Sequence, residues 1–189
     1  MEKATAAVLR EIENRNKPLL VAVDDRCASG KTTFAAALER ELGCAVIHTD
    51  HFFLRPEQRT EERLNEAGGN VDYERLREEV MLPLLTGKPF SYRKFDCGEM
   101  KLSAKIEVKP TTVTVIEGSY SCCPALWEYY GLRIFLTVDP QEQLRRIELR
   151  NGNEAAVKFR ERWIPLEEKY FAACKIRERC DLVFGSEAL

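Results

Sequence analysis

Gly30, Lys31 and Thr32 have the types and the spacing of a phosphate-binding loop. They belong to residues 25–33, Asp-Arg-Cys-Ala-Ser-Gly-Lys-Thr-Thr, a run of the form x-x-x-x-x-Gly-Lys-[Ser/Thr]. In such a loop, backbone N–H groups and the positive N-terminus of the next helix surround the β- and γ-phosphates of a nucleoside triphosphate. The lysine reaches the terminal oxygens, and the hydroxyl after it holds Mg²⁺. The residues expected to bind ATP are therefore Cys27, Ala28, Ser29, Gly30, Lys31, Thr32 and Thr33.

The flanking residues supply the context that this motif requires. Residues 19–23 are a short apolar run, which is typical of a strand buried on both faces. Residues 32–42 are rich in Ala, Leu and Glu and predict a helix that ends at Gly43. A second Gly-Lys pair, Gly87-Lys88, lacks this context because a proline follows it. The order strand, loop, helix therefore favours nucleotide binding at residues 25–33.

Asp25 stands where the first glycine of such a loop is usual. Glycine there permits backbone conformations that a Cβ atom disfavours. Aspartate tolerates the left-handed conformation better than most residues, so we expect the loop to survive the replacement. A carboxylate close to phosphates is unfavourable unless it points away from them. Asp25 therefore bears on the expected affinity for a nucleotide and not on the expected fold.

Acidic residues follow three of the predicted strands. Asp24 and Asp25 follow the first, Asp50 the second and Glu117 the third. In open α/β sheets, ligands bind beyond the carboxyl ends of the strands. Phosphoryl transfer uses one acid to orient or deprotonate the attacking hydroxyl and another to help hold Mg²⁺. We assign the first role to Asp50 and the second to Glu117 together with Thr32, while His51 is an open candidate for a substrate contact.

Two groups of arginines flank a small segment, Asn151-Gly152-Asn153. Their arrangement is typical of a lid, about residues 146–162, that closes over a triphosphate. Arginine suits the charge of a transferring phosphoryl group. The predicted catalytic arginines are Arg146 and Arg150, and the predicted substrate contacts are Arg160 and Arg162. Glu142 lies four residues before Arg146, so a solvated ion pair on a helix is the alternative for that side chain.

Strands and helices alternate along the chain, which predicts an α/β fold with a parallel sheet and helices on both faces. The expected strands are residues 19–23, 44–49, 112–116, 133–138 and 181–184. The expected helices are residues 2–16, 32–42, 72–85, 126–130, 140–150 and 154–173, the last kinked or restarted at Pro165. We expect one P-loop kinase domain over residues 1–189. Its core would be residues 18–53 and 111–184, and its substrate-covering insertion residues 54–110, with a mobile connection at 54–71 and a β-hairpin at 89–108.

Bulk composition excludes several classes of protein. The 189 residues carry a net charge of −2, so no broad basic surface points to nucleic acid. No apolar run approaches the length of a membrane span, and no signal-peptide core follows the N-terminus. Seven irregularly spaced cysteines without a Cys-x-x-Cys pair favour reduced thiols over disulfides or zinc. We expect a cytoplasmic protein whose partner is a small-molecule acceptor, with a homo-oligomer left open.

From about residue 18 to 184 the chain resembles the uridine kinase family of P-loop kinases. Beyond the phosphate loop, the resemblance rests on four segments: Thr49-Asp50-His51-Phe52-Phe53, Asn70-Val71-Asp72, Pro89-Phe90-Ser91-Tyr92 and Ile116-Glu117-Gly118. Residues 144–150 are similar to the arginine-bearing lid of that family. The resemblance implies that Asp50 is the catalytic base, that Asp72 holds the ribose hydroxyls and that Tyr92 contacts the base. It also implies ATP and Mg²⁺ as cofactors.

One departure leaves the acceptor open. The nucleoside kinases of the family carry a histidine after the segment of Tyr92, whereas this chain has no histidine after His51. A nucleoside such as uridine or cytidine is the first expectation for the acceptor. A pantothenate-like or sugar-like alcohol is the alternative, as is a regulatory nucleotide-binding protein with little turnover. A GTPase is disfavoured because the chain has no Asn-Lys-x-Asp motif.

Overall fold

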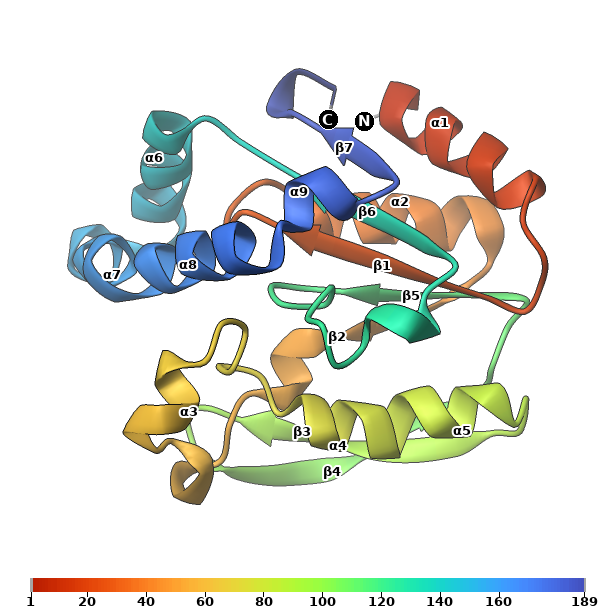
Figure 1. The fold of residues 1–189 in the computed structure, drawn as a ribbon, viewed down its shortest axis with the longest axis horizontal. Coiled ribbons are helices and arrows are strands. Elements are labelled where there is room, and N and C mark those ends of the chain that lie inside the picture. The colour runs from red at the N-terminus through yellow and green to blue at the C-terminus, as the bar shows by residue number, and fades with distance from the viewer. Residues whose placement is uncertain (1, 189) are drawn as a thin grey trace.

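Five parallel strands form the central sheet of the computed structural model, which describes residues 2–188 (Figure 1). In spatial order they are β2 (Ala45–His48), β5 (Val113–Glu117), β1 (Leu19–Asp25), β6 (Leu132–Leu136) and β7 (Leu182–Phe184). Glu117 lies opposite both Val23 of β1 and His48 of β2 in the strand register. The loops after these three strands therefore start at one edge of the sheet. The predicted five-stranded parallel sheet is confirmed.

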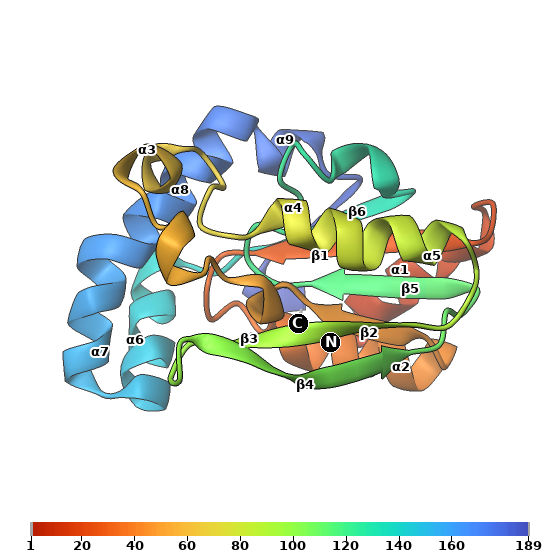
Figure 2. The same ribbon diagram turned by 90° about the horizontal axis from the view of Figure 1, so that it is seen from below.

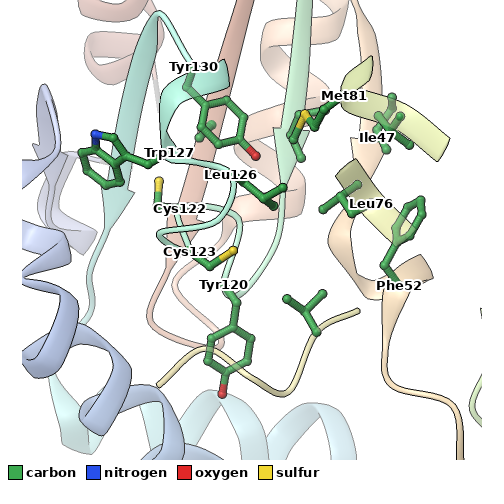
Figure 3. Close-up of a cluster of buried hydrophobic side chains, with 14 of the residues drawn as sticks. Ile47, Phe52, Leu76, Met81, Tyr120, Cys122, Cys123, Leu126, Trp127 and Tyr130 are labelled. Carbon is green, nitrogen blue, oxygen red and sulfur yellow. The ribbon is translucent and has the colours of Figure 1, made fainter. Parts of the chain in front are cut away.

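Side chains from the two faces of β1 enter different hydrophobic clusters. Leu20 and Ala22 belong to one cluster, whereas Val21 and Val23 belong to the other. This alternation follows from the twofold repeat of a strand, and burial on both faces explains the continuous apolar run of β1. Figure 3 shows part of the first cluster, which includes Phe52, Leu76 and Leu126.

Helices cover both faces of the sheet. On one face lie α1 (Glu2–Glu13) and α2 (Lys31–Leu42), which contribute Val8 and Phe34 to the core. The other face is covered by a continuous helical segment made of α4 (Tyr73–Leu76), a wider turn (Arg77–Met81) and α5 (Leu82–Leu85), together with short helical turns at Thr49–Phe52 and Trp127–Tyr129. Gly43 ends α2 in the left-handed conformation, as its position predicts.

The predicted β-hairpin consists of β3 (Phe90–Asp96) and β4 (Lys101–Val108). Residues 54–71, expected to be a mobile connection, contain a helical turn (Pro56–Gln58) and α3 (Glu61–Asn65). Arg63 holds this segment in place. Its guanidinium donates to the carbonyls of Gly69 and Val71, each at 2.9 Å, and pairs with Glu74 at 2.6 Å.

The last helical region contains residues 146–162, whose role as a lid stays a prediction. It comprises α6 (Pro140–Asn151), α7 (Asn153–Lys158), a wide turn (Phe159–Trp163), α8 (Ile164–Cys174) and α9 (Ile176–Arg179), followed by a short turn at Ser186–Ala188. Pro165 sits in the first turn of α8, where its missing N–H costs nothing, so the helix restarts there as expected. Ile147 and Ala156 pack against Cys27 and thereby join the lid to the phosphate loop. Within residues 2–188, no helix is both long and apolar enough to span a membrane.

Candidate active site

The phosphate loop connects the end of β1 to the start of α2. Ala28 has φ 63° and Gly30 has φ 108°, so these two residues adopt the left-handed region that lets the loop turn. Asp25 does not: it completes β1 as a fully buried strand residue. Aspartate is therefore tolerated because this position needs no left-handed backbone. The expectation that Asp25 is tolerated because it adopts the left-handed conformation was wrong.

The side chain of Asp25 points to the lysine of the loop. Its carboxylate lies 3.3 Å from the ammonium of Lys31 and accepts the hydroxyl of Ser29 at 2.9 Å. Burial raises the pKa of Asp25, although Lys31 and Ser29 act against this rise. Burial also acts to lower the pKa of Lys31, but the carboxylates of Asp25, Asp50 and Glu117 outweigh it and raise that pKa. The lysine therefore stays charged and is held by a carboxylate of its own loop.

Asp24, next to it, anchors the loop after β5. Its carboxylate accepts the backbone N–H groups of Tyr120 and Cys122 at 3.1 and 3.0 Å, and the hydroxyl of Tyr170 at 2.7 Å. Burial raises the pKa of Asp24 to about 7, against the effect of the bonds from Tyr170 and Cys122. Asp24 thus fixes the position of the loop after β5 from the core side, and it lines neither of the two cavities described below.

A third buried carboxylate reaches the loop from α8. Glu167 accepts the backbone N–H of Cys27 at 3.2 Å and the hydroxyl of Ser119 at 3.3 Å. Burial, with the charge of Asp25 as the next cause, raises the pKa of Glu167 to about 8. The neighbouring Glu168 pairs with Arg26, so two successive acids of α8 hold the phosphate loop.

A cavity of about 400 Å³ lies against the phosphate loop. Lys31 and Asp50 both line it, so the predicted phosphate-binding and base residues share one cavity. Arg59, Asn70 and Arg150 supply further polar groups. The remaining walls are mostly apolar and come from the lid, the hairpin and the loops after β2 and β5: Cys27, Phe53, Cys97, Met100, Ser119, Tyr120, Phe159, Trp163 and Glu167. Figure 2 shows that α6, α7 and the turn of the hairpin lie at the same end of the molecule.

A second cavity, of about 510 Å³, adjoins the first and shares Asp50 with it. Thr32 and Glu117 line it, as does His48, whose ring nitrogen Nδ1 bonds to the carboxylate of Glu117. This bond is the main cause that raises the pKa of His48. The second oxygen of Glu117, Oε2, is buried without a hydrogen-bond partner. The structure thus brings together both residues that the sequence assigned to Mg²⁺.

The donor set of the second cavity fits a hard cation. Mg²⁺ prefers oxygen ligands and usually takes only one or two from the protein, the others coming from phosphates and water. A threonine hydroxyl and an unpartnered carboxylate oxygen beside the phosphate loop meet this description. Residues 2–188 hold no cluster of three or more His, Cys, Asp or Glu side chains arranged for a metal.

The two arginines of α6 contact the phosphate loop in different ways. Arg146 donates to the carbonyls of Ala28 and Ser29 at 3.2 and 3.3 Å and also pairs with Glu142 at 2.8 Å. The ion pair expected as an alternative is therefore present together with the loop contact. Arg150 lines the first cavity, with its guanidinium 3.9 Å from the sulfur of Cys27.

Arg160 and Arg162 are exposed and line neither cavity in this arrangement. The guanidinium of Arg162 lies over the ring of Trp163, 4.9 Å from its centroid. Because Trp163 itself lines the first cavity, Arg162 lies one side chain away from it. Their contact with a substrate stays a prediction that depends on movement of the lid.

Asp72 and Tyr92 are buried and line neither of the two cavities. Asp72 caps α4 by accepting the N–H of Arg75 at 3.1 Å, and its Oδ2 is buried without a hydrogen-bond partner. The hydroxyl of Tyr92 bonds to Nδ1 of His51 at 2.9 Å, and His51 lines the second cavity. The substrate roles of Asp72 and Tyr92 stay predictions. Of the three side chains, His51 is the one that lines a cavity.

Three residues of the site had no role in the sequence-based assignment: Ser119, Glu167 and Arg59. Ser119 directly follows the segment of Glu117, so its place at a strand end was a usable signal. Glu167 follows Pro165 in the first turn of a helix, which gives no hint that it reaches a loop 140 residues away. Cys27 is held as a neutral thiol, because burial and the charge of Glu167 raise its pKa to about 12.

Comparison with solved structures places this geometry in a known fold. A protein from Bacillus stearothermophilus, assigned provisionally as a uridine kinase, matches with a TM-score of 0.70 and 21% sequence identity, over 97% of this chain and 100% of that one. A protein from Silicibacter sp., assigned provisionally as a fructose transport system kinase, matches with a TM-score of 0.71 and 22% identity, over 96% and 97%. No protein-family model matches the sequence. At these identities the similarity shows only that the chain shares the fold of these two proteins.

Proposed function

We propose that the protein is an ATP- and Mg²⁺-dependent kinase that phosphorylates a hydroxyl group of a small molecule. One observation carries this proposal: Lys31 of the phosphate loop and Asp50 of the next strand end line the same cavity. A phosphoryl donor held by the loop and an acceptor held near Asp50 would then meet within one space. Such positioning is the main contribution of a protein to phosphoryl transfer.

Each side chain of the cavity has a role in this reaction. Asp50 orients the acceptor hydroxyl or takes its proton as the hydroxyl attacks the γ-phosphate in line. Lys31 neutralises charge on the phosphate oxygens, and Arg150 approaches them from the lid. Arg146 acts at one remove, because it holds the carbonyls of the loop whose N–H groups bind phosphate. Thr32 and Glu117 would hold Mg²⁺, which bridges phosphate oxygens when bound.

A nucleoside is the first proposal for the acceptor. Aromatic side chains line the first cavity, among them Phe53, Tyr120 and Trp163, and such surfaces suit a flat base. A sugar-like alcohol is the second, because Asn70 and Arg59 offer polar contacts that do not require a base. The provisional assignments of the two similar structures, one a uridine kinase and the other a fructose transport system kinase, match these two acceptors.

The test is release of ADP with ATP and Mg²⁺ against a panel of nucleosides, sugars and pantothenate-like alcohols. The Lys31→Ala variant is the blank. It removes the positive charge that neutralises the phosphate oxygens, and Lys31 lies outside the apolar core. A rate that depends on uridine or cytidine supports a nucleoside kinase. A rate that depends only on another alcohol keeps the reaction and moves the acceptor. ATP binding without any acceptor-dependent rate would refute the kinase and favour a regulatory nucleotide-binding protein.

A further inference from the structure

One serine hydroxyl lies between two buried carboxyl groups of the phosphate loop. Ser119 Oγ is 3.3 Å from Oδ1 of Asp25 and 3.3 Å from Oε1 of Glu167. A hydroxyl has a single hydrogen to donate. If Ser119 donates to one carboxylate, its oxygen faces the other as an acceptor. The second carboxyl group therefore needs a hydrogen of its own to complete the contact.

The charges around this cluster lead to the same result. Asp25 is fully buried, Glu167 is 5% exposed, and Lys31 is the one cation in direct contact with either of them among residues 2–188. Two buried carboxylates and one ammonium leave an excess negative charge, which is costly away from water. A proton shared between the carboxyl groups through Ser119 removes that excess.

Nucleotide binding disturbs this balance. The lysine of a phosphate loop turns to the phosphate oxygens, so Asp25 loses its cation when a triphosphate binds. At the same time Glu167, which lines the first cavity, faces the added negative charge of the phosphates. Both changes strengthen the hold of the cluster on its proton.

We propose that Asp25 and Glu167 are positioning residues that share one proton through Ser119, and that this proton must be present for a nucleoside triphosphate to bind tightly. Asp25 holds Lys31 in the empty loop, and Glu167 holds the N–H of Cys27. The proposal rests on the proposed nucleotide binding but not on phosphoryl transfer. It gives a role to the residue that replaces the loop glycine.

Other charged groups surround the cluster, and none of them replaces the shared proton. Asp24 adds a third buried carboxyl group, but Tyr170 and backbone N–H groups occupy it. Glu117 of β5 is also buried and its charge acts to raise the pKa of Asp25, but its hydrogen bond is to His48 and not to the cluster. Arg150 approaches from α6 and contacts the sulfur of Cys27, and Arg26 is paired with Glu168 on the far side of the loop. From the loop after β5, Tyr120 contributes a phenol whose pKa is raised by burial and so stays neutral.

The direction of the pH effect follows from linkage. Because the complex binds the proton more strongly than the free protein does, affinity falls as pH rises past the point where the free cluster loses it. The pKa of Glu167, raised to about 8 by burial, places that point. Loss of one proton weakens binding by up to about tenfold for each pH unit above it. The terminal phosphate of a nucleotide, like a phosphomonoester, titrates at about pH 6 and so does not interfere there.

The test is isothermal titration calorimetry with a non-hydrolysable ATP analogue and Mg²⁺ from pH 7 to 9.5. At pH 8.5 it is repeated in two buffers that differ in ionisation enthalpy, which counts the protons taken up. We expect uptake approaching one proton and a falling affinity above pH 8 in the wild type. The variants Glu167→Gln and Asp25→Asn should take up almost no proton and lose most of the pH dependence. Glu168→Gln, the matched control on the same turn of α8, should keep the wild-type slope.

Each result decides between the two proposals. Equal slopes in the wild type and in Glu167→Gln would overturn the shared proton and leave the proposed kinase intact. A variant-dependent slope without any acceptor-dependent ADP release would support the shared proton and refute the kinase. Failure of the folded wild type to bind the analogue at any pH would overturn both. Circular dichroism of each variant separates loss of the proton from loss of the fold.

Discussion

Replacement of Tyr170 by phenylalanine tests whether the buried carboxylate of Asp24 is held by hydrogen bonds. The phenol of Tyr170 is fully buried and donates to Asp24 at 2.7 Å, so Tyr170→Phe deletes one donor and leaves almost no cavity. A hydrogen bond to a charged group contributes about 1.5–3 kcal/mol, whereas one to a neutral group contributes about 0.5–1.5 kcal/mol. We expect the free energy of unfolding to fall by the larger amount when Asp24 is ionised.

The pH dependence gives this prediction its sign. Tyr170 stabilises the ionised form of Asp24 and so lowers the pKa of that carboxyl group, which burial otherwise raises; the net value is about 7. Above pH 7 the folded protein carries the anion, and the deficit of Tyr170→Phe should be largest there. Below pH 7 Asp24 is protonated, and the deficit should shrink to that of a neutral hydrogen bond.

Urea unfolding at pH 5.5 and pH 9, followed by circular dichroism, measures both deficits. Tyr73→Phe is the matched control, because its hydroxyl donates to the exposed Glu66 at 2.8 Å and should contribute less than about 0.5 kcal/mol. A deficit of Tyr170→Phe that is the same at both pH values would refute the ionised Asp24. A deficit no larger than that of the control would refute the buried hydrogen bond between Tyr170 and Asp24.

Three further predictions concern the loop, the turn after β5 and the proposed base. Arg146→Ala should weaken binding of an ATP analogue by about tenfold or more in calorimetry, because two bonds to loop carbonyls are lost. Arg145→Ala, whose side chain bonds to Glu142 and does not reach the loop, should change it less than about twofold. Gly118→Ala should cost more than about 3 kcal/mol in urea unfolding, since its φ is 138° and an added Cβ would lie 1.8 Å from Oγ1 of Thr49. Gly87→Ala, at φ 67° in open space, should cost about 1 kcal/mol. Asp50→Asn should cut kcat by about 10²- to 10⁴-fold with little change in affinity for ATP, and loss of affinity alone would contradict its role as the base.

The phosphate loop and the order of the elements were predictable because their signals are local. An apolar run followed by Gly30-Lys31-Thr32 and a helix specifies the strand, the loop and the helix within 24 residues. The acids at the strand ends were predictable too, since parallel strands bring their carboxyl ends to one edge of a sheet. Asp50 and Lys31 therefore meet in one cavity although they lie 19 positions apart in the sequence.

Glu167 shows what a local signal cannot supply. Its distance from the loop depends on how α8 packs against β6 and the core through Phe171 and Tyr170, and on the restart of the helix at Pro165. No sequence pattern within α8 indicates whether Glu167 or Glu168 faces inward. The burial of Tyr92 has the same origin, because hairpin position and strand register decide it.

The replacement of the loop glycine by Asp25 links these two kinds of information. By sequence alone, an acid at this position is unfavourable because it places a carboxylate close to the phosphates. In the fold, the turn of the loop is made at Ala28 and Gly30, so position 25 is free to carry a side chain. That side chain then requires partners, and the fold provides Lys31, Ser29 and Ser119. The carboxylate is thus compatible with the fold, and its effect falls on the protonation of the site, where Glu167→Gln and Asp25→Asn measure it.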